Sequence, residues 1–175
     1  MADINNVKNG EGQTLHSAES ERLRRAIELL FFAYRDFTGD PDEILQQSGF
    51  GRAHHRVLHF IGAYPGISVA QLLEILKITK QSLARVLRQL VQDGFVEQRM
   101  GKRDRRKRLL YLTPKGRQFE RQLAMPQRER FRAAFAAAGD DAVAGYFKVI
   151  EHLINAQDRQ IILQNFKRGR STDDS

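Results

Sequence analysis

Positive charge gathers in one short stretch of this sequence, between Arg99 and Arg108. Seven cations and one acid, Asp104, give the stretch a net charge of +6, whereas the whole chain carries +8. Ammonium and guanidinium groups at this density neutralise phosphates, which is the chemistry of nucleic-acid binding. An isolated basic run is most often a solvated surface. Whether this one binds nucleic acid therefore depends on the helices and strands on either side of it.

A second group of donors is expected on a helix over 79–93. Thr79 is a favoured N-cap residue, and Gly94 is a natural stop for the helix. One face of this helix is apolar, and the opposite face carries polar side chains that suit phosphate oxygens and base edges in a DNA major groove. The helix begins with Thr79-Lys80-Gln81-Ser82, and its outward face then offers Arg85, Arg88 and Gln92.

The elements predicted next to these two groups of donors form a helix-turn-helix and a hairpin. A short helix over 69–76, capped by Ser68, ends just before Thr79, and two short helices so close together are typical of a helix-turn-helix. The free N–H groups at the start of each helix could bind a phosphate, at Ser68 and at Thr79. Residues 95–99 and 109–112 are predicted to form a hairpin whose tip holds the basic run. A hairpin beside a recognition helix is a wing, and its arginines suit the negative potential of a narrow minor groove.

Residues 52–116 resemble the MarR family of bacterial transcription regulators. The chain has the helix pair SVAQLLEILKITKQSLARVLRQLVQDGFVEQR and the wing DRRKRLLYLTPKG. Asp104 stands nine residues before the Thr of the Leu-Thr-any-any-Gly sequence at 112–116, which is the spacing of the family's Asp-any-Arg signature. The resemblance implies that Arg106 enters the minor groove and that Asp104 orients it. The other wing residues expected to bind DNA are Lys102, Arg103 and Arg105. The resemblance also implies that Lys80, Gln81, Ser82 and Arg85 face the DNA, because they fall where the family's recognition helix does so.

Two positions depart from the family pattern. The family often has arginine at the end of the first wing strand, where this chain has Gln98 followed by Arg99. Ala84 stands where threonine or serine is common, which removes one potential DNA contact. The fine sequence preference is therefore expected to differ.

The resemblance implies a mainly α fold with a small β-hairpin wing, which is a winged helix-turn-helix with N- and C-terminal dimerisation helices. The N-terminal flank agrees, since its apolar residues from Leu23 to Tyr34 follow helical spacing. The expected organisation is a flexible arm over 1–16, a single domain over 17–166 and a disordered tail over 167–175. Within the domain, 17–48 and 114–166 are the dimerisation helices and 52–113 is the winged helix-turn-helix.

Two features are expected within the C-terminal flank. Pro126 should kink or interrupt the helix capped by Thr113, because proline removes a backbone donor and clashes with the preceding turn. A last helix over 140–166 carries an apolar seam from Val143 to Ile161. The alternating spacing of four and three along this seam predicts contact with another helix.

Three histidines, His54, His55 and His59, fall on one expected helix. His55 and His59 have the i, i+4 spacing of two metal ligands on one helix face. Two histidines with no Cys, Asp or Glu nearby are too few ligands for a typical site, so packing or hydrogen-bonding roles are favoured. The resemblance implies another role, because small acidic or phenolic effectors bind in a cleft between the dimer helices and the winged module of the family. Phe31 and Tyr34 could line that cleft together with the three histidines.

The composition excludes several classes of protein. The 175 residues contain no Cys, so disulfides, thiol nucleophiles and thiolate zinc sites are impossible. The polar N-terminus shows no signal peptide, and no apolar stretch is long enough to span a membrane, which predicts a cytoplasmic protein. There is no Gly-rich phosphate loop or nucleophile elbow, so the chain is not expected to be an enzyme or to hold a cofactor.

The sequence therefore predicts a homodimeric, sequence-specific transcription regulator that binds a pseudo-palindromic site in double-stranded DNA. Repression is the favoured mode, and a small aromatic or acidic effector could release the DNA. The alternative is a winged-helix module whose basic wing binds an acidic protein, RNA or a membrane surface. Sequence-specific binding to duplex DNA distinguishes the two, because a protein-binding wing would show none.

Overall fold

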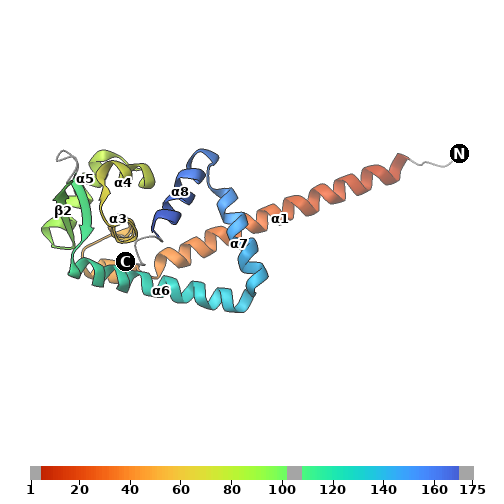
Figure 1. The fold of residues 1–175 in the computed structure, drawn as a ribbon. Helices are drawn as coiled ribbons and strands as arrows, with labels where there is room; N and C mark the ends of the chain where they lie inside the picture. Colours follow the sequence, from red (N-terminus) through yellow and green to blue (C-terminus); the bar gives the residue numbers. More distant parts are fainter. Residues whose placement is uncertain (1–4, 102–107, 170–175) are drawn as a thin grey trace. The chain divides into compact units, whose positions relative to one another are not determined.

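The structure is a computed structural model that describes residues 5–101 and 108–169. The chain divides into two compact units, Met1–Asp40 and Pro41–Ser175. Helices dominate the described residues, and the strands form one small antiparallel sheet (Figure 1). The predicted mainly α fold with a β-hairpin is therefore confirmed. No helix in the described ranges combines the length and the apolar content needed to cross a membrane.

The first unit contains one helix, α1 (Asn5–Gly39). Its start corrects the prediction of a flexible arm over 1–16, because residues 5–16 are helical. A nucleated helix gains one hydrogen bond with each added residue, and this segment has no proline to stop it. Large apolar side chains lie exposed along the second half of α1, and they are Leu23, Ile27, Leu29, Leu30, Phe31, Phe32 and Tyr34.

The second unit is built around α3 (Arg52–Ala63), whose Val57, Leu58 and Ile61 are fully buried. A short helix, α2 (Asp42–Gln47), precedes it. Arg52 holds the carboxylate of Asp42 through two hydrogen bonds of 2.7 and 3.1 Å, and these bonds lower the pKa of that carboxyl group. The core around α3 takes buried side chains from the surrounding helices and strands, including Leu45, Leu72, Leu83, Leu90, Leu110 and Leu123.

Two short helices, α4 (Val69–Leu76) and α5 (Lys80–Gln92), follow α3 at the predicted positions. The sheet has the strand order β1-β3-β2. Its strands are β1 (Ile67–Ser68), β2 (Val96–Met100) and β3 (Arg108–Leu112). β2 and β3 pair antiparallel, so the two arms of the predicted hairpin are confirmed. β1 was missed, because a two-residue strand has no periodicity and exists only through its pairing with β3.

The C-terminal half holds three helices, α6 (Pro114–Ala138), α7 (Asp140–Leu153) and α8 (Ala156–Gly169). Figure 1 shows α6 leading away from the sheet toward α7. Of the two predicted effects of Pro126, interruption of the helix is wrong, since α6 runs through it, and a kink stays a prediction. Proline removes only one backbone donor, and the hydrogen bonds on both sides of it carry the helix on.

The predicted single helix over 140–166 is also wrong, because the chain breaks between α7 and α8. Ile154 adopts an extended conformation with φ −70° and ψ 136°. Arg159 makes this break stable, since its Nη2 donates to the carbonyls of His152 and Ile154, both at 3.0 Å. The seam from Val143 to Ile161 therefore does not lie on one helix. The predicted disordered tail over 167–175 is corrected in part, since α8 extends to Gly169 and residues 170–175 lie outside the described ranges.

Candidate nucleic-acid interface

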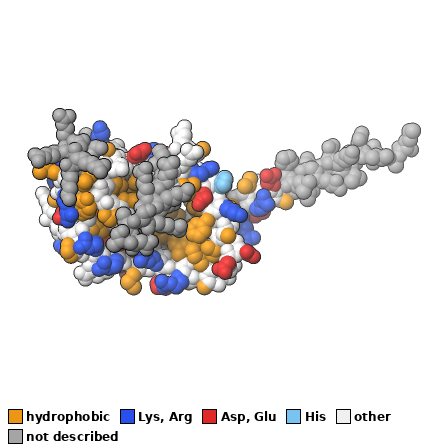
Figure 2. Space-filling view, in the orientation of Figure 1, with side chains coloured by type: hydrophobic (Ala, Val, Ile, Leu, Met, Phe, Trp, Pro, Cys, Tyr) orange, Lys and Arg blue, Asp and Glu red, His pale blue; other side chains and the backbone are white. Residues whose placement is uncertain are grey.

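The helix α5 has the two faces that the sequence predicted. Leu83, Val86, Leu87 and Leu90 are buried against the core, which fixes the orientation of the helix about its axis. The polar residues on the other face are all exposed, and they are Lys80, Gln81, Ser82, Arg85 and Arg88. In Figure 2, Lys and Arg side chains lie over the part of the molecule that holds α5 and β2. The helix thus presents a row of donors on a rigid base.

The hydroxyl groups at the two helix starts already have partners within the chain. Thr79 Oγ1 accepts from the backbone N–H of Ser82 at 3.1 Å and donates to Ser82 Oγ at 2.9 Å. Ser68 forms a capping box with Gln71, since its Oγ accepts from Gln71 N at 3.3 Å and its own N–H donates to Gln71 Oε1 at 3.0 Å. Both residues therefore define where a helix begins, as predicted, and phosphate binding by them stays a prediction.

The turn between α4 and α5 is held in a left-handed conformation. Lys77 has a φ of 52°, and its backbone N–H donates to Leu73 O at 2.9 Å. Arg56 reaches the same turn from α3, donating to Leu76 O at 3.3 Å. The Lys77 ammonium group lies 3.0 Å from the carboxylate of Asp158, so α8 is tied to the helix-turn-helix.

The end of α5 is fastened to the base of the wing by the residues around Thr113. Thr113 Oγ1 donates to Gly94 O at 2.7 Å, and its backbone N–H donates to Phe95 O at 3.0 Å. Lys115 donates to Asp93 O at 2.8 Å and stacks over the ring of Phe95 at 4.2 Å. A cation at a helix C-terminus also interacts favourably with the helix dipole. The sequence motif at 112–116 thus fastens the end of α5 to the base of the wing, a role that the sequence reasoning missed.

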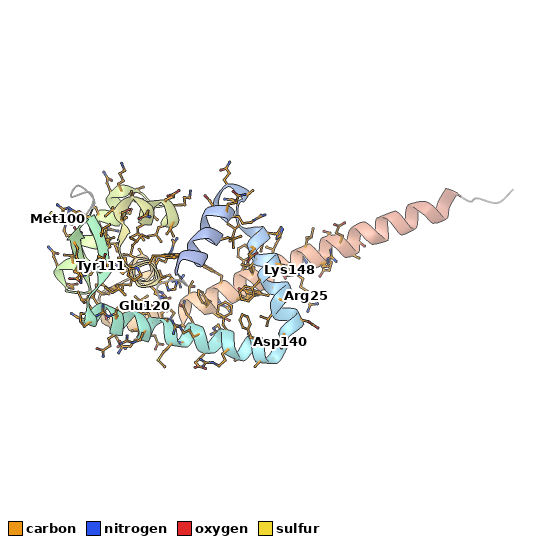
Figure 3. The ribbon with its side chains drawn as sticks, viewed as in Figure 1. Arg25, Met100, Tyr111, Glu120, Asp140 and Lys148 are labelled. Atoms are coloured by element: carbon orange, nitrogen blue, oxygen red, sulfur yellow. The ribbon has the colours of Figure 1, made fainter. Side chains whose placement is uncertain are left out.

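The tip of the wing, residues 102–107, lies outside the described ranges. The predicted wing contacts Lys102, Arg103, Asp104, Arg105 and Arg106 all belong to it. At the base of the wing two further arginines are described, and the prediction did not name either as a contact. Arg99 Nη2 donates to Glu97 Oε1 at 2.5 Å, and Arg108 Nη1 donates to Gln98 Oε1 at 3.1 Å. Figure 3 labels Met100, which ends β2, and Tyr111 on β3.

The three histidines of α3 have three different environments. His54 caps its own helix, because Nδ1 accepts from Gly51 N at 3.1 Å while Nε2 lies 3.0 Å from Gln89 Oε1. His55 is buried, and this burial, with a contribution from the nearby charge of His59, lowers its pKa. His59 is exposed, with Nδ1 3.4 Å from Glu120 Oε1.

These environments favour packing and hydrogen-bonding roles over a metal pair. No group of three or more potential metal ligands occurs in the part of the chain that the structure describes. Phe31 and Tyr34 belong to the other unit, where both are exposed on α1. The effector site that would unite them with the histidines stays a prediction.

The helix pair, the fastened recognition helix and the antiparallel wing define a winged helix-turn-helix protein of the DNA-binding class. Residues 48–107 match the sequence profile of the MarR family. The chain is 54% identical over 144 residues to the HTH-type transcriptional regulator PetP of Rhodobacter capsulatus, a match that covers 82% of this chain and 87% of PetP. This chain belongs to the MarR family.

Solved structures share the fold at low sequence identity. The crystal structure of Streptococcus pneumoniae FabT in complex with DNA has a TM-score of 0.65 and 22% identity, covering 75% of this chain and 94% of FabT. A MarR family regulator from Silicibacter pomeroyi has a TM-score of 0.64 and 20% identity, covering 75% of this chain and 90% of the other. MarR family members are DNA-binding transcription regulators, typically dimers, and not enzymes, so the predicted class is confirmed.

Proposed function

We propose that this regulator binds a pseudo-palindromic DNA site as a homodimer, with α5 in the major groove and the wing in the adjacent minor groove. The observation that carries the proposal is the row of exposed donors from Lys80 to Arg88, which lies on a helix whose other face is fully buried. Such a helix can present base-reading side chains without rearranging. Two-fold symmetry of the dimer places the half-sites about one helical turn, or roughly 10 bp, apart.

Different residues would have different roles at this interface. Gln81 and Arg85 are long enough to read base edges, whereas Lys80 and Arg88 suit phosphates. The hydroxyl of Ser82 accepts a hydrogen bond from the hydroxyl of Thr79, so a DNA contact at this position would involve both side chains. Ser68 would contribute through the backbone N–H groups at the start of α4. In the wing, Arg106 would enter the minor groove, oriented by Asp104 and flanked by Lys102, Arg103 and Arg105.

The exposed apolar side chains of α1 support the homodimer. Ile27, Phe31 and Tyr34 are each more than half exposed, which is costly for a helix that stays in water. On α7, Leu153 is also more than half exposed, and Phe147 is 49% exposed. A second copy of the chain offers the same apolar helices and would bury both.

Regulation by a small molecule is the remaining part of the proposal. A small aromatic or acidic effector would bind near Phe31, Tyr34, His54, His55 and His59, and would favour a form of the dimer that cannot bind DNA. Release of the DNA would then relieve repression. A regulator of this kind works in the bacterial cytoplasm, where the DNA is.

Selection from random duplex DNA tests the proposal. The full-length protein is incubated with the pool at about 0.15 M salt, and the bound DNA is sequenced. We expect a palindromic motif with half-sites near 10 bp apart. Salt-sensitive retention with no enriched motif would contradict the proposal and would favour an acidic protein, RNA or a membrane as partner.

Variants then separate the roles of the residues. Gln81→Ala and Arg85→Ala should each change the preferred bases, at a cost of about 1–3 kcal/mol for the selected site. Arg106→Ala should weaken binding to every duplex. It should also reduce the slope of log affinity against log salt concentration by about one. Arg121→Ala, which removes an exposed arginine of α6, is the matched control and should leave the motif unchanged.

A further inference from the structure

Three side chains meet on one face of the wing, at its base. Glu97 stands opposite Tyr111 in the ladder between β2 and β3, and Arg99 follows two residues after Glu97. Because side chains alternate along a strand, Glu97, Arg99 and Tyr111 share one face of the sheet. We propose that these three residues form a phosphate clamp, in which Arg99 binds the DNA backbone and Tyr111 is its positioning residue. The inference rests on the proposed function.

Arg99 is fixed on two sides and still open to solvent. Its guanidinium carbon lies 4.5 Å from the centre of the Tyr111 ring, within the range of a cation–π contact. Its Nη2 donates to Glu97 Oε1 at 2.5 Å. The Arg99 side chain is nevertheless 60% exposed. The guanidinium group is thus held in place but not covered.

The ring that supports Arg99 is itself held in place. A Cβ atom on Gly66 would lie only 2.8 Å from the hydroxyl oxygen of Tyr111, so the tyrosine packs directly on the Gly66 backbone. Gly66 has a φ of 84°, and its N–H donates to Leu110 O at 2.9 Å. The Tyr111 side chain therefore lies between the guanidinium group of Arg99 and a fixed piece of main chain.

This arrangement suits a phosphate as the ligand. Arginine has five N–H donors in a planar fork that matches phosphate geometry, and Glu97 engages only one of its nitrogens. A side chain that is already ordered loses less entropy when it binds. The acid two residues before the arginine repeats, at the base of the wing, the spacing of Asp104 and Arg106 at its tip.

The ligand is expected to be the sugar–phosphate backbone beside the minor groove that the wing enters. Phosphate contacts position a protein on DNA without reading its sequence. Arg99 is therefore expected to raise the affinity for selected and unselected duplexes alike. The base preference set by α5 should not depend on it.

The test measures binding of full-length variants to one selected and one random duplex over a range of salt concentrations. Arg99→Gln should weaken binding to both duplexes about tenfold and reduce the slope of log affinity against log salt by about one. Arg99→Lys keeps the charge but loses the planar stack, so it should weaken binding about threefold with an unchanged slope. Tyr111→Leu should resemble Arg99→Lys, and Tyr111→Phe, which keeps the ring, should bind like the wild type.

A double variant separates positioning from a merely structural role. In the Arg99→Gln background, Tyr111→Leu should cause no further loss of affinity, because there is no guanidinium group left to position. An equal loss in both backgrounds would overturn the inference, as would an Arg99→Gln variant with wild-type affinity and slope. Thermal unfolding checks that each variant is folded. If the Tyr111→Leu variant does not fold, the Arg99→Lys variant still tests the inference. Wild-type DNA affinity of Arg99→Lys would also overturn it.

The two proposals can fail separately. A wild-type protein that selects no motif contradicts the proposed function, whatever Arg99 does on random duplex. A wild-type protein that selects a palindrome while Arg99→Gln binds normally contradicts only the clamp.

Discussion

A methyl group placed on Gly116 would lie 2.0 Å from the carbonyl oxygen of Phe95. The two residues join separate elements, since Phe95 follows α5 and Gly116 lies in the first turn of α6. Only a residue without a side chain permits this contact between backbones. The glycine of the family motif thus fixes the distance between α5, the wing and α6.

Gly116→Ala should therefore destabilise the protein by about 3 kcal/mol and weaken DNA binding, because the backbone of Phe95 must move. Denaturant unfolding measures the loss. Gly145→Ala is the matched control, since nothing lies within 4 Å of that position on α7. Alanine in that helix should stabilise by up to about 1 kcal/mol. Equal stability of the two variants would show that the contact at Phe95 carries no energy.

Thr79→Ala should destabilise the protein by about 1 kcal/mol, because the backbone N–H of Ser82 loses its acceptor at 3.1 Å. The first turn of α5 would fray, and sequence-specific DNA binding should weaken with it. Thr79→Ser keeps the hydroxyl group and should retain both properties. Unfolding and binding measured on the same two variants check the prediction, which fails if serine is no better than alanine.

The buried His55 should make stability depend on pH. Burial lowers the pKa of His55 below its ordinary value of 6.5, so the folded state binds fewer protons than the unfolded state as pH falls through 6.5. The free energy of unfolding should therefore fall with falling pH in this window, and level off once the folded-state pKa is passed.

His55→Gln should flatten this dependence, measured as denaturant unfolding between pH 8 and pH 5. His152→Gln, which changes an exposed histidine of α7, should leave the His55-dependent part in place. A His55→Gln variant that loses stability with pH as steeply as the wild type would contradict the prediction.

Lys77→Gly should stabilise the protein by up to about 1 kcal/mol. Lys77 is the one non-glycine residue of the described ranges with a positive φ, and glycine adopts a φ of 52° without the steric cost. Lys148→Gly, in the interior of α7, should instead destabilise by about 1 kcal/mol. Thermal unfolding compares the two. If Lys77→Gly also lowered the stability, the ion pair between Lys77 and Asp158 would contribute more to stability than the strained backbone costs.

The sequence by itself determined the helix-turn-helix, the wing and the family. These elements are set by local signals, since Ser68 and Thr79 cap helices through their own first turns and Gly94 ends a helix by adopting a φ of 75°. The two faces of α5 also follow from helical periodicity alone. For that reason Arg85 and Arg88 could be assigned to the exposed face from the order of the residues, whereas Lys80, Gln81 and Ser82 were expected there from the family resemblance.

Only the tertiary structure decided the features that join distant segments. The strand at Ile67 exists because it pairs with Leu110, and the break at Ile154 depends on the side chain of Arg159. Likewise, Tyr111 meets Arg99 only through the register of β2 and β3. Contacts of this kind depend on the packing of segments far apart along the chain, and no local periodicity encodes them.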